Sequence, residues 1–205
     1  MSEEILVNVT PMETRVAVVE NGATQDIHIE RSASRGIVSN IYAGRISRVL
    51  PGMQAAFVDI GAARNAFLHV SDIVGGADAS ERIADHLREG QAVTVQVTKD
   101  PLGSKGARVT SQLSVASRYL VYMPQTQHVG VSQRIDDAEE RARLQEVLAN
   151  ALEAEEMDEA GGFILRTAAE GAGPAEIAQD LRFLKRLWAA VSRRAAAGSL
   201  PTLVV

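Results

Sequence analysis

Hydrophobic and polar residues alternate along the first thirty residues of the chain. Three segments, residues 4–10, 14–20 and 24–30, follow this two-residue period, which is typical of β-strands with one face against a core. Asn21-Gly22 separates the last two segments, and this pair favours a tight hairpin turn. Three strands with one apolar face need a cover, so we predict that this piece is part of a larger layer rather than a domain by itself.

The alternation returns after the polar residues 31–35 and predicts a second all-β block. Its expected elements are strands at 36–50, 55–60 and 65–70, a short helix at 80–88 capped by Ser80, and strands at 91–100 and 107–114. Three strands, a helical interruption and two more strands are the order of a five-stranded OB barrel. Barrels of this type bind oligonucleotides on their middle strands and loops.

Beyond residue 115, segments with the hydrophobic period of a helix alternate with short strand-like runs. The expected elements are strands at 117–124 and 163–167, a helix capped by Asp136 or Asp137 that ends near Leu152, and a last helix over 174–196. The last helix carries its apolar residues on one stripe, which favours packing against a core. The whole chain is therefore predicted to be an α+β protein.

The composition narrows the classes of protein that the chain can belong to. Of its 205 residues, 46% are hydrophobic, yet no apolar run approaches the roughly 18 residues that a membrane span needs. The first residues, MSEEILVNV, carry acids where a secretion signal carries bases. The absence of cysteine excludes disulfides and thiolate metal sites. We therefore expect a cytoplasmic protein with no membrane partner.

The charge is distributed unevenly. The formal net charge of −5 argues mildly against nucleic acid as a partner, but residues 35–70 and 91–118 together hold eight bases against two acids, a local charge of +6. Residues 136–160 hold ten acids against two bases, a local charge of −8. Phosphate is attracted by the local field rather than by the total charge. The basic segments are therefore a candidate nucleic-acid surface, with an ordinary mixed surface as the alternative.

The hairpin at 55–70 carries the first candidate binding residues. Phe57 and Phe67 lie on its two strands, in a chain with only 4% aromatic residues. On one sheet face, two such rings can stack unpaired bases, although burial in the core is the usual fate of phenylalanine. Lys105, in the glycine-flanked loop 101–106, could place its ammonium group on a phosphate or could simply be solvated.

The pair Arg166-Thr167 is the second candidate site. A guanidinium can hold two phosphate oxygens while a neighbouring hydroxyl donates a third hydrogen bond. The alternative is a local cap or salt bridge at a strand end. The acids between residues 153 and 159 could suggest a metal site, but they are bunched along the sequence and we interpret them as a solvated face.

Several segments together resemble a known family. FLHVSDI (67–73) and REGQ (88–91) resemble the S-one type of OB fold, an RNA-binding module. In chain order, the segments NVTPMETRVAVVENG, IVSNIYAGRISRVLPGMQAAFVDIG, TKDPLGSKGARVTSQLS, SRYLVYMP and GGFILRTAAEG resemble the amino-terminal region of the ribonuclease E and ribonuclease G family, in particular its ribonuclease G branch. The resemblance implies magnesium-dependent cleavage of single-stranded RNA, with a preference for a 5′-monophosphate end.

The resemblance also implies residue roles. The RNA-binding residues implied for the OB fold are Phe57, Phe67 and Lys105, and those implied for 5′-phosphate sensing are Arg166, Thr167, Ser117 and Val121, with Arg134 in a less direct role. Two positions depart from the pattern. Ala43 stands where relatives often carry lysine, which removes one possible phosphate contact, and Ser117 stands where the ribonuclease E branch has glycine.

The family pattern implies four parts of the chain. They are residues 1–35, strands of a ribonuclease H-like layer; residues 36–115, the OB fold; residues 116–198, an α/β 5′-sensor region; and residues 199–205, the start of a further part. In the family, the catalytic aspartates that hold magnesium and the cysteines that hold zinc between subunits of a homo-oligomer lie downstream. We therefore expect no catalytic residue, metal ligand or bound cofactor in this chain.

Three functions stay open at this point. The first is an RNA-binding and 5′-end-sensing portion of an endoribonuclease that does not cleave RNA alone. The second is a stand-alone module for single-stranded RNA. The third is a protein-interaction scaffold in which both phenylalanine rings are core. Whether the chain acts as an enzyme by itself is left undecided by the sequence.

Overall fold

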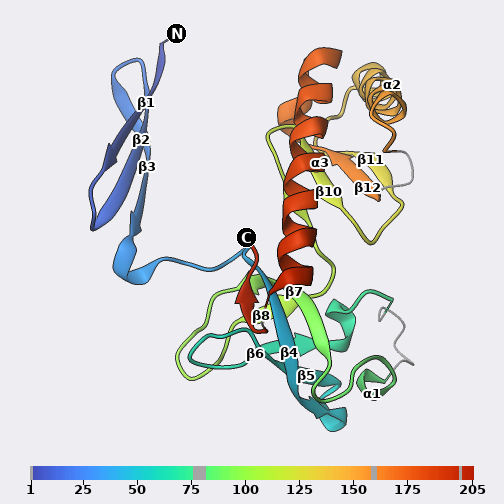
Figure 1. The fold of residues 1–205 in the computed structure, drawn as a ribbon. Helices are drawn as coiled ribbons and strands as arrows, with labels where there is room; N and C mark the ends of the chain where they lie inside the picture. Colours follow the sequence, from blue (N-terminus) through green and yellow to red (C-terminus); the bar gives the residue numbers. More distant parts are fainter. Residues whose placement is uncertain (1, 76–81, 158–160, 199) are drawn as a thin grey trace. The chain divides into compact units, whose positions relative to one another are not determined.

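The computed structural model describes residues 2–75, 82–157, 161–198 and 200–205 (Figure 1). The chain divides into two compact units, Met1–Ile37 and Val38–Val205. The first unit is a small β-sheet, and the second combines a β-barrel with a region of strands and helices. The predicted α+β class is confirmed.

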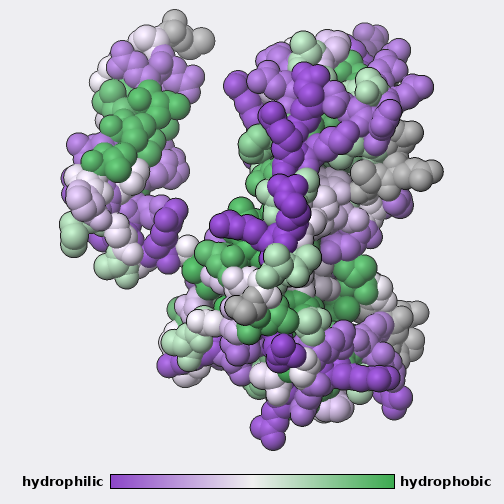
Figure 2. All heavy atoms as spheres, in the orientation of Figure 1, coloured by the Kyte–Doolittle hydropathy of each residue, from purple (hydrophilic) through white to green (hydrophobic). Residues whose placement is uncertain are grey.

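The first unit is an antiparallel meander of three strands. The strands are β1 (Glu3–Val9), β2 (Glu13–Glu20) and β3 (Ala23–Arg31), in the order β1-β2-β3. Asn21 and Gly22 have φ angles of 50° and 78°, the left-handed pair that a tight hairpin requires. Six apolar side chains of the outer strands are 50–70% exposed: Ile5, Leu6, Val7, Val9, Ile27 and Ile29. Figure 2 shows this hydrophobic surface in green on the sheet.

The apolar residues of this sheet lie on both of its faces. Ile5 and Val7 have Val18 and Val16 as register partners, whereas Leu6 pairs with Ala17 and so points to the opposite side. The sequence predicted one apolar face, and this prediction was wrong because Ile5, Leu6 and Val7 of β1 are consecutive apolar residues rather than a strict alternation. A strand that is apolar on both sides is typical of a sheet buried between two layers.

The second unit begins with a closed five-stranded barrel, as predicted. Its strands are β4 (Ile41–Leu50), β5 (Ala55–Asp59), β6 (Ala66–His69), β7 (Ala92–Lys99) and β8 (Arg108–Thr110). The sheet order β4-β5-β6-β8-β7 is closed by pairing of β4 with β7. Side chains that alternate inward, such as Val58, Leu68 and Val109, fill the interior.

Several barrel elements are shorter than the sequence predicted. Strand β4 begins at Ile41 rather than at residue 36. The helix α1 is a single turn, Ile83–His86, preceded by Arg82 as its N-cap residue, and the predicted cap Ser80 lies outside the described residues. Strand β8 ends at Thr110 rather than at residue 114. The reason is a side chain: the backbone N–H of Ser114 donates to Oε1 of Gln96 at 2.8 Å, which takes it out of the ladder.

The region after the barrel is a four-stranded sheet covered by two helices. Its strands β9 (Val115–Ala116), β10 (Leu120–Met123), β11 (Val129–Val131) and β12 (Gly162–Leu165) are ordered β11-β12-β10-β9. The helices are α2 (Ala138–Ala154) and α3 (Pro174–Ala197). The side chain of Asp137 caps α2 by accepting from the N–H groups of Glu139 and Glu140. The predicted stripe of α3 is buried at Ile177, Leu181, Leu184 and Val191.

The last residues pack onto the barrel. Strand β13 (Thr202–Leu203) adds to the edge of β4, opposite Ala43 and Tyr42 (Figure 1). Val204 is buried, and its carbonyl oxygen accepts a hydrogen bond from Arg194 of α3. One hydrophobic cluster runs from β4 through the four-stranded sheet to α3, so the barrel and the α/β region share a continuous core. None of the described helices is long and apolar enough to cross a membrane.

Candidate nucleic-acid interface

The two phenylalanines lie together on the outside of the barrel. Phe57 of β5 and Phe67 of β6 are direct register partners, and their rings meet edge to face with centroids 6.2 Å apart. Both side chains are half-buried, whereas the neighbouring residues Val58 and Leu68, which point the other way, are fully buried. The rings are therefore open to solvent on one side, where a base can stack.

The loop that carries Lys105 is fastened beside the start of β6. Its backbone closes on itself through two hydrogen bonds between Leu102 and Lys105, of 3.0 and 3.2 Å. The guanidinium of Arg64 donates to the carbonyl of Gly103. Gly106 lies so close to the carbonyl oxygen of Asn65 that an added Cβ atom would be 2.0 Å from it. The loop thus holds the exposed Lys105 three residues before Arg108, which is the register partner of Phe67.

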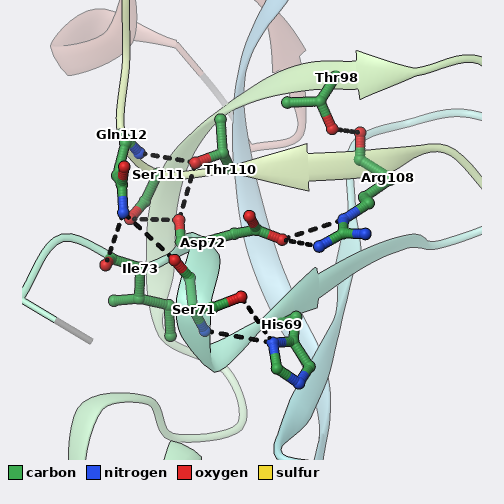
Figure 3. A network of polar contacts seen from close by, with 9 residues as sticks. All are labelled: His69, Ser71, Asp72, Ile73, Thr98, Arg108, Thr110, Ser111 and Gln112. Atoms are coloured by element: carbon green, nitrogen blue, oxygen red, sulfur yellow. Dashed lines mark hydrogen bonds and ion pairs between the residues drawn. The ribbon is translucent and has the colours of Figure 1, made fainter. Parts of the chain in front are cut away.

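A polar network continues from the aromatic pair around the end of β6 (Figure 3). Nε and Nη2 of Arg108 both donate to Oδ2 of Asp72, at 3.0 and 2.8 Å, and the Asp72 carbonyl accepts from the hydroxyl of Thr110 at 2.8 Å. His69 lies on the same strand face as Phe67, with Nδ1 2.8 Å from Oγ of Ser71. Sequence reasoning assigned nothing to Arg108, although its place in the basic segment 91–118 was a usable signal.

Position 43 belongs to the core rather than to this surface. Ala43 is only 2% exposed and lies on β4 between Thr94 of β7 and Thr202 of β13. The sequence analysis treated Ala43 as the loss of one possible phosphate contact; in this chain the Ala43 side chain belongs to the hydrophobic core cluster that the barrel shares with α3. A dependence of RNA affinity on residue 43 is not expected.

Arg166 and Thr167 lie at an open pocket of about 470 Å³ at the end of β12. The pocket is also lined by Ser132 and Arg134, from the segment that follows β11. The hydroxyls of Ser132 and Thr167 are 3.2 Å apart, and Arg166 and Thr167 are exposed. Two guanidinium groups and two hydroxyls at one recess are hydrogen-bond donors suited to a phosphate. The sequence prediction missed Ser132, because β11, which positions it, was not foreseen.

The turn between β9 and β10 contacts Arg166 directly. Nη1 of Arg166 donates to the carbonyl of Ser117, and the backbone N–H of Arg166 donates to the carbonyl of Tyr119 at 2.8 Å. Val121 lies farther along β10, inside the ladder between Ala116 and Ile164. Of Ser117 and Val121, both named from the sequence, the structure thus brings Ser117 of the turn before β10 to Arg166, while Val121 lies within the β10 ladder.

Comparison with known proteins shows the family to which the chain belongs. A family model described as "Ribonuclease E/G family" matches residues 114–205. Ribonuclease G of Escherichia coli (strain K12) is 57% identical over 204 residues, which cover 95% of this chain and 41% of the relative. The chain belongs to the ribonuclease E/G family. It spans about two fifths of the length of the ribonuclease G relatives that it matches.

Both branches of the ribonuclease E/G family resemble this chain. Ribonuclease G of Haemophilus influenzae (strain ATCC 51907 / DSM 11121 / KW20 / Rd) is 54% identical over 93% of this chain and 40% of the relative. Ribonuclease E of Escherichia coli (strain K12) is 36% identical over 98% of this chain and 19% of the relative. The barrel of this member is of the OB type.

Among the acids between residues 153 and 159 of this ribonuclease E/G member, Glu155 makes structural contacts, while Glu153 and Glu156 are exposed. Within the described residues, no group of three or more His, Asp or Glu could hold a metal ion. Glu155 accepts from Arg182 at 3.1 Å, and its carbonyl accepts from Lys185 at 2.6 Å, so it ties α2 to α3. Asp158 and Glu159, from the same acidic cluster, lie outside the described residues.

Glu140 fastens α2 to the loop that leads into α3. Its carboxylate accepts from Arg143 at 2.6 and 2.7 Å and from the N–H of Gly171 at 2.8 Å. The hydrogen bond from Arg143, and then that from Gly171, lower the pKa of Glu140 from 4.5 to about 2. Hydrogen bonds from Gly173 and then Tyr119 likewise lower the pKa of Glu176 in the first turn of α3. These contacts fix the loop that follows the pocket residues.

Proposed function

We propose that this chain is the RNA-binding and 5′-end-sensing portion of a ribonuclease G-like endoribonuclease that acts on single-stranded RNA. The aromatic pair and Lys105 of the barrel are proposed to hold unpaired nucleotides. The pocket of Arg166 and Thr167 is proposed to bind the 5′-monophosphate. The observation that carries the proposal is this pocket, in which Ser132, Arg134, Arg166 and Thr167 converge.

The chemistry of the pocket suits a terminal phosphate. Nη1 of Arg166 is occupied by the Ser117 carbonyl, and no other atom of this guanidinium has a hydrogen bond within the described ranges 2–75, 82–157, 161–198 and 200–205. The edge formed by Nε and Nη2 therefore remains for two phosphate oxygens. The Thr167 hydroxyl can donate to a third oxygen, and Arg134 adds a second positive charge.

The barrel supports the other half of the proposal. Phe57 and Phe67 present a pair of half-exposed rings, Arg108 is the register partner of Phe67, and the exposed Lys105 lies three residues before Arg108 in the preceding loop. Stacking of bases on aromatic rings contributes about 1–3 kcal/mol per base and tolerates any sequence. The shared core between β4 and α3 holds this surface and the pocket on one body, so that one RNA strand can engage both.

The cleavage step is proposed to lie outside these 205 residues. The family resemblance implies that aspartates outside these residues would hold magnesium, which would supply an activated water and charge stabilisation for cleavage. The chain alone is proposed to bind RNA in the cytoplasm without cleaving it. Magnesium-dependent cleavage of a 5′-monophosphorylated oligonucleotide by the purified chain would contradict this part of the proposal.

The test compares two RNAs that differ only in the chemical group at the 5′ end. Fluorescence anisotropy of the purified chain with 3′-labelled oligonucleotides bearing a 5′-monophosphate or a 5′-hydroxyl gives the ratio of the two Kd values. We expect tighter binding of the monophosphate, and we expect Arg166→Ala to bring the ratio close to one. Arg186→Ala, which removes an exposed charge from α3, is the matched control and should leave the ratio unchanged. Equal Kd values for the wild-type chain would refute the sensing function.

A further inference from the structure

Asp180 of α3 holds the turn before β10 through a single oxygen atom. Its Oδ2 accepts from the hydroxyl of Ser117 at 2.6 Å, from the N–H of Tyr119 at 2.9 Å and from the N–H of Leu120 at 3.1 Å. A carboxylate that gathers three donors of one turn fixes the backbone of that turn strongly, because hydrogen bonds to a charged acceptor are the stronger ones.

The same turn holds Arg166 on its other side. Ser117 donates from its hydroxyl to Asp180 and accepts with its carbonyl from Nη1 of Arg166. Tyr119 donates from its N–H to Asp180 and accepts with its carbonyl from the N–H of Arg166. Asp180 and Arg166 are thus connected by two parallel chains of hydrogen bonds, each of which passes through one residue of the turn.

This arrangement also explains the hydroxyl at position 117. The Ser117 hydroxyl has one proton, and the 2.6 Å contact with the Asp180 carboxylate is shorter than the 3.0 Å contact with the Leu120 carbonyl. The proton therefore belongs to the Asp180 contact, and the side chain lies against α3. Among the described residues that line the phosphate pocket, neither Ser117 nor Asp180 appears.

We propose that Asp180 is the positioning residue of the phosphate sensor: it orients the guanidinium of Arg166 through Ser117 and Tyr119 without touching the RNA. This inference rests on the proposed function of the pocket. In this chain, which has Ser117 where the ribonuclease E branch has glycine, the serine side chain then anchors the turn to Asp180 and does not contact the pocket. The 5′-monophosphate preference then depends on a helix that lies behind the pocket.

The direction in which substitution of Asp180 changes monophosphate binding distinguishes a positioning role from a purely electrostatic one. A carboxylate near an anion site repels phosphate, so removal of its charge alone would tighten monophosphate binding. Loss of an orienting contact acts in the opposite direction and weakens it. Asp180→Ala is expected to lower the monophosphate-to-hydroxyl preference roughly tenfold, as for loss of a charge-assisted hydrogen-bond network. Asp180→Asn keeps an acceptor oxygen for the turn and is expected to retain most of the preference.

The readout is the ratio of Kd values for the two matched RNAs. Loss of RNA binding by the barrel would change both Kd values equally and leave this ratio unchanged. The Kd for the 5′-hydroxyl RNA should stay within about twofold of the wild-type value in every variant, which also reports that the chain is folded. Ser117→Ala removes one of the three hydrogen bonds to Asp180 and should give a smaller loss in the same direction. In the Arg166→Ala background, Asp180→Ala should cause no further loss, because the two residues act as one unit.

Two results would overturn the inference while the proposed function stands. One is an unchanged or increased monophosphate preference in Asp180→Ala with a normal preference in the wild-type chain. The other is an additive loss in the double variant with Arg166→Ala. A different result, no preference in the wild-type chain at all, removes the proposed function and this inference with it. If Asp180→Ala does not fold, Ser117→Ala and Asp180→Asn carry the test.

Discussion

Phe57 and Phe67 face each other across β5 and β6, while the residues that follow them, Val58 and Leu68, face the barrel interior. At consecutive positions of the hairpin, one side chain is therefore available for binding and the next packs in the core. A ring that is open on one side can be removed with little change in the core, whereas loss of a buried leucine leaves a cavity. The two faces of the same hairpin can therefore be tested independently.

We expect Phe57→Ala and Phe67→Ala each to weaken binding of single-stranded RNA by roughly fivefold or more, since stacking on an aromatic ring contributes about 1–3 kcal/mol per base. Leu68→Ala is the matched control on the buried face. It should lower the free energy of unfolding by about 2–5 kcal/mol with little effect on the RNA affinity of the folded chain. Anisotropy titration and urea unfolding measure the two quantities. Large stability losses in both phenylalanine variants, with RNA affinity intact, would favour the scaffold alternative.

Lys105 is expected to contribute a phosphate contact that depends on salt. Each phosphate neutralised by a basic side chain releases condensed counterion, so Lys105→Ala should reduce the slope of log Kd against log salt concentration by about one. The measurement is RNA affinity of the chain between about 50 and 200 mM salt. Arg186→Ala again controls for general loss of charge, and an identical slope in Lys105→Ala would remove Lys105 from the interface.

Gly106 is expected to be intolerant of any side chain. A Cβ atom there would lie 2.0 Å from the carbonyl oxygen of Asn65, so Gly106→Ala must push the Lys105 loop away from β6. We expect a loss of about 1–3 kcal/mol in the free energy of unfolding, as for other overpacked sites, together with weaker RNA binding. Gly52→Ala, where the structure has open space around the added atom, is the control. Equal stability of both variants in urea unfolding would contradict the close approach.

The main elements could be predicted because each is encoded locally. The left-handed pair Asn21-Gly22, the cap at Asp137 and the apolar stripe of α3 depend on neighbours within a few residues. Strand β11 could not be foreseen, because three residues around Gly130 become a strand only through parallel pairing with β12. Likewise, the end of β8 depends on Gln96, whose side chain is 18 residues from Ser114 in sequence.

For the candidate sites, too, the sequence indicated what is local and missed what depends on distant residues. The residue types at Phe57, Phe67 and Arg166 could be named from the sequence, since their chemistry suits bases and phosphate. The partners that orient them could not, because they come from distant segments: Ser117 is 49 residues from Arg166, and Asp180 is 63 residues from Ser117. The pairing of β4 with β13 at Ala43 was hidden for the same reason, because that contact joins positions about 160 residues apart.

The link between α2 and the loop before α3 should make stability depend on acid pH. The Glu140 side chain is 17% exposed, and Arg143 and Gly171 lower its pKa to about 2, below its value of 4.5 in an unfolded chain. The folded chain therefore binds the proton less tightly than the unfolded chain does. The stabilisation is complete above about pH 4.5 and is lost as the pH falls through about 2. Between these values, the wild-type Tm should decline more steeply than that of Glu140→Gln.

The difference in Tm between wild type and Glu140→Gln is therefore expected to be largest near neutral pH and to shrink toward pH 2. Thermal unfolding followed by circular dichroism at several pH values measures it. Glu146→Gln removes an exposed acid from the same helix and controls for the general effect of helix charge. A Tm difference for Glu140→Gln that stays constant from pH 6 to pH 2 would show that the ion pair with Arg143 does not stabilise the folded chain. The loop between Thr167 and α3 would then be held by its backbone contacts alone.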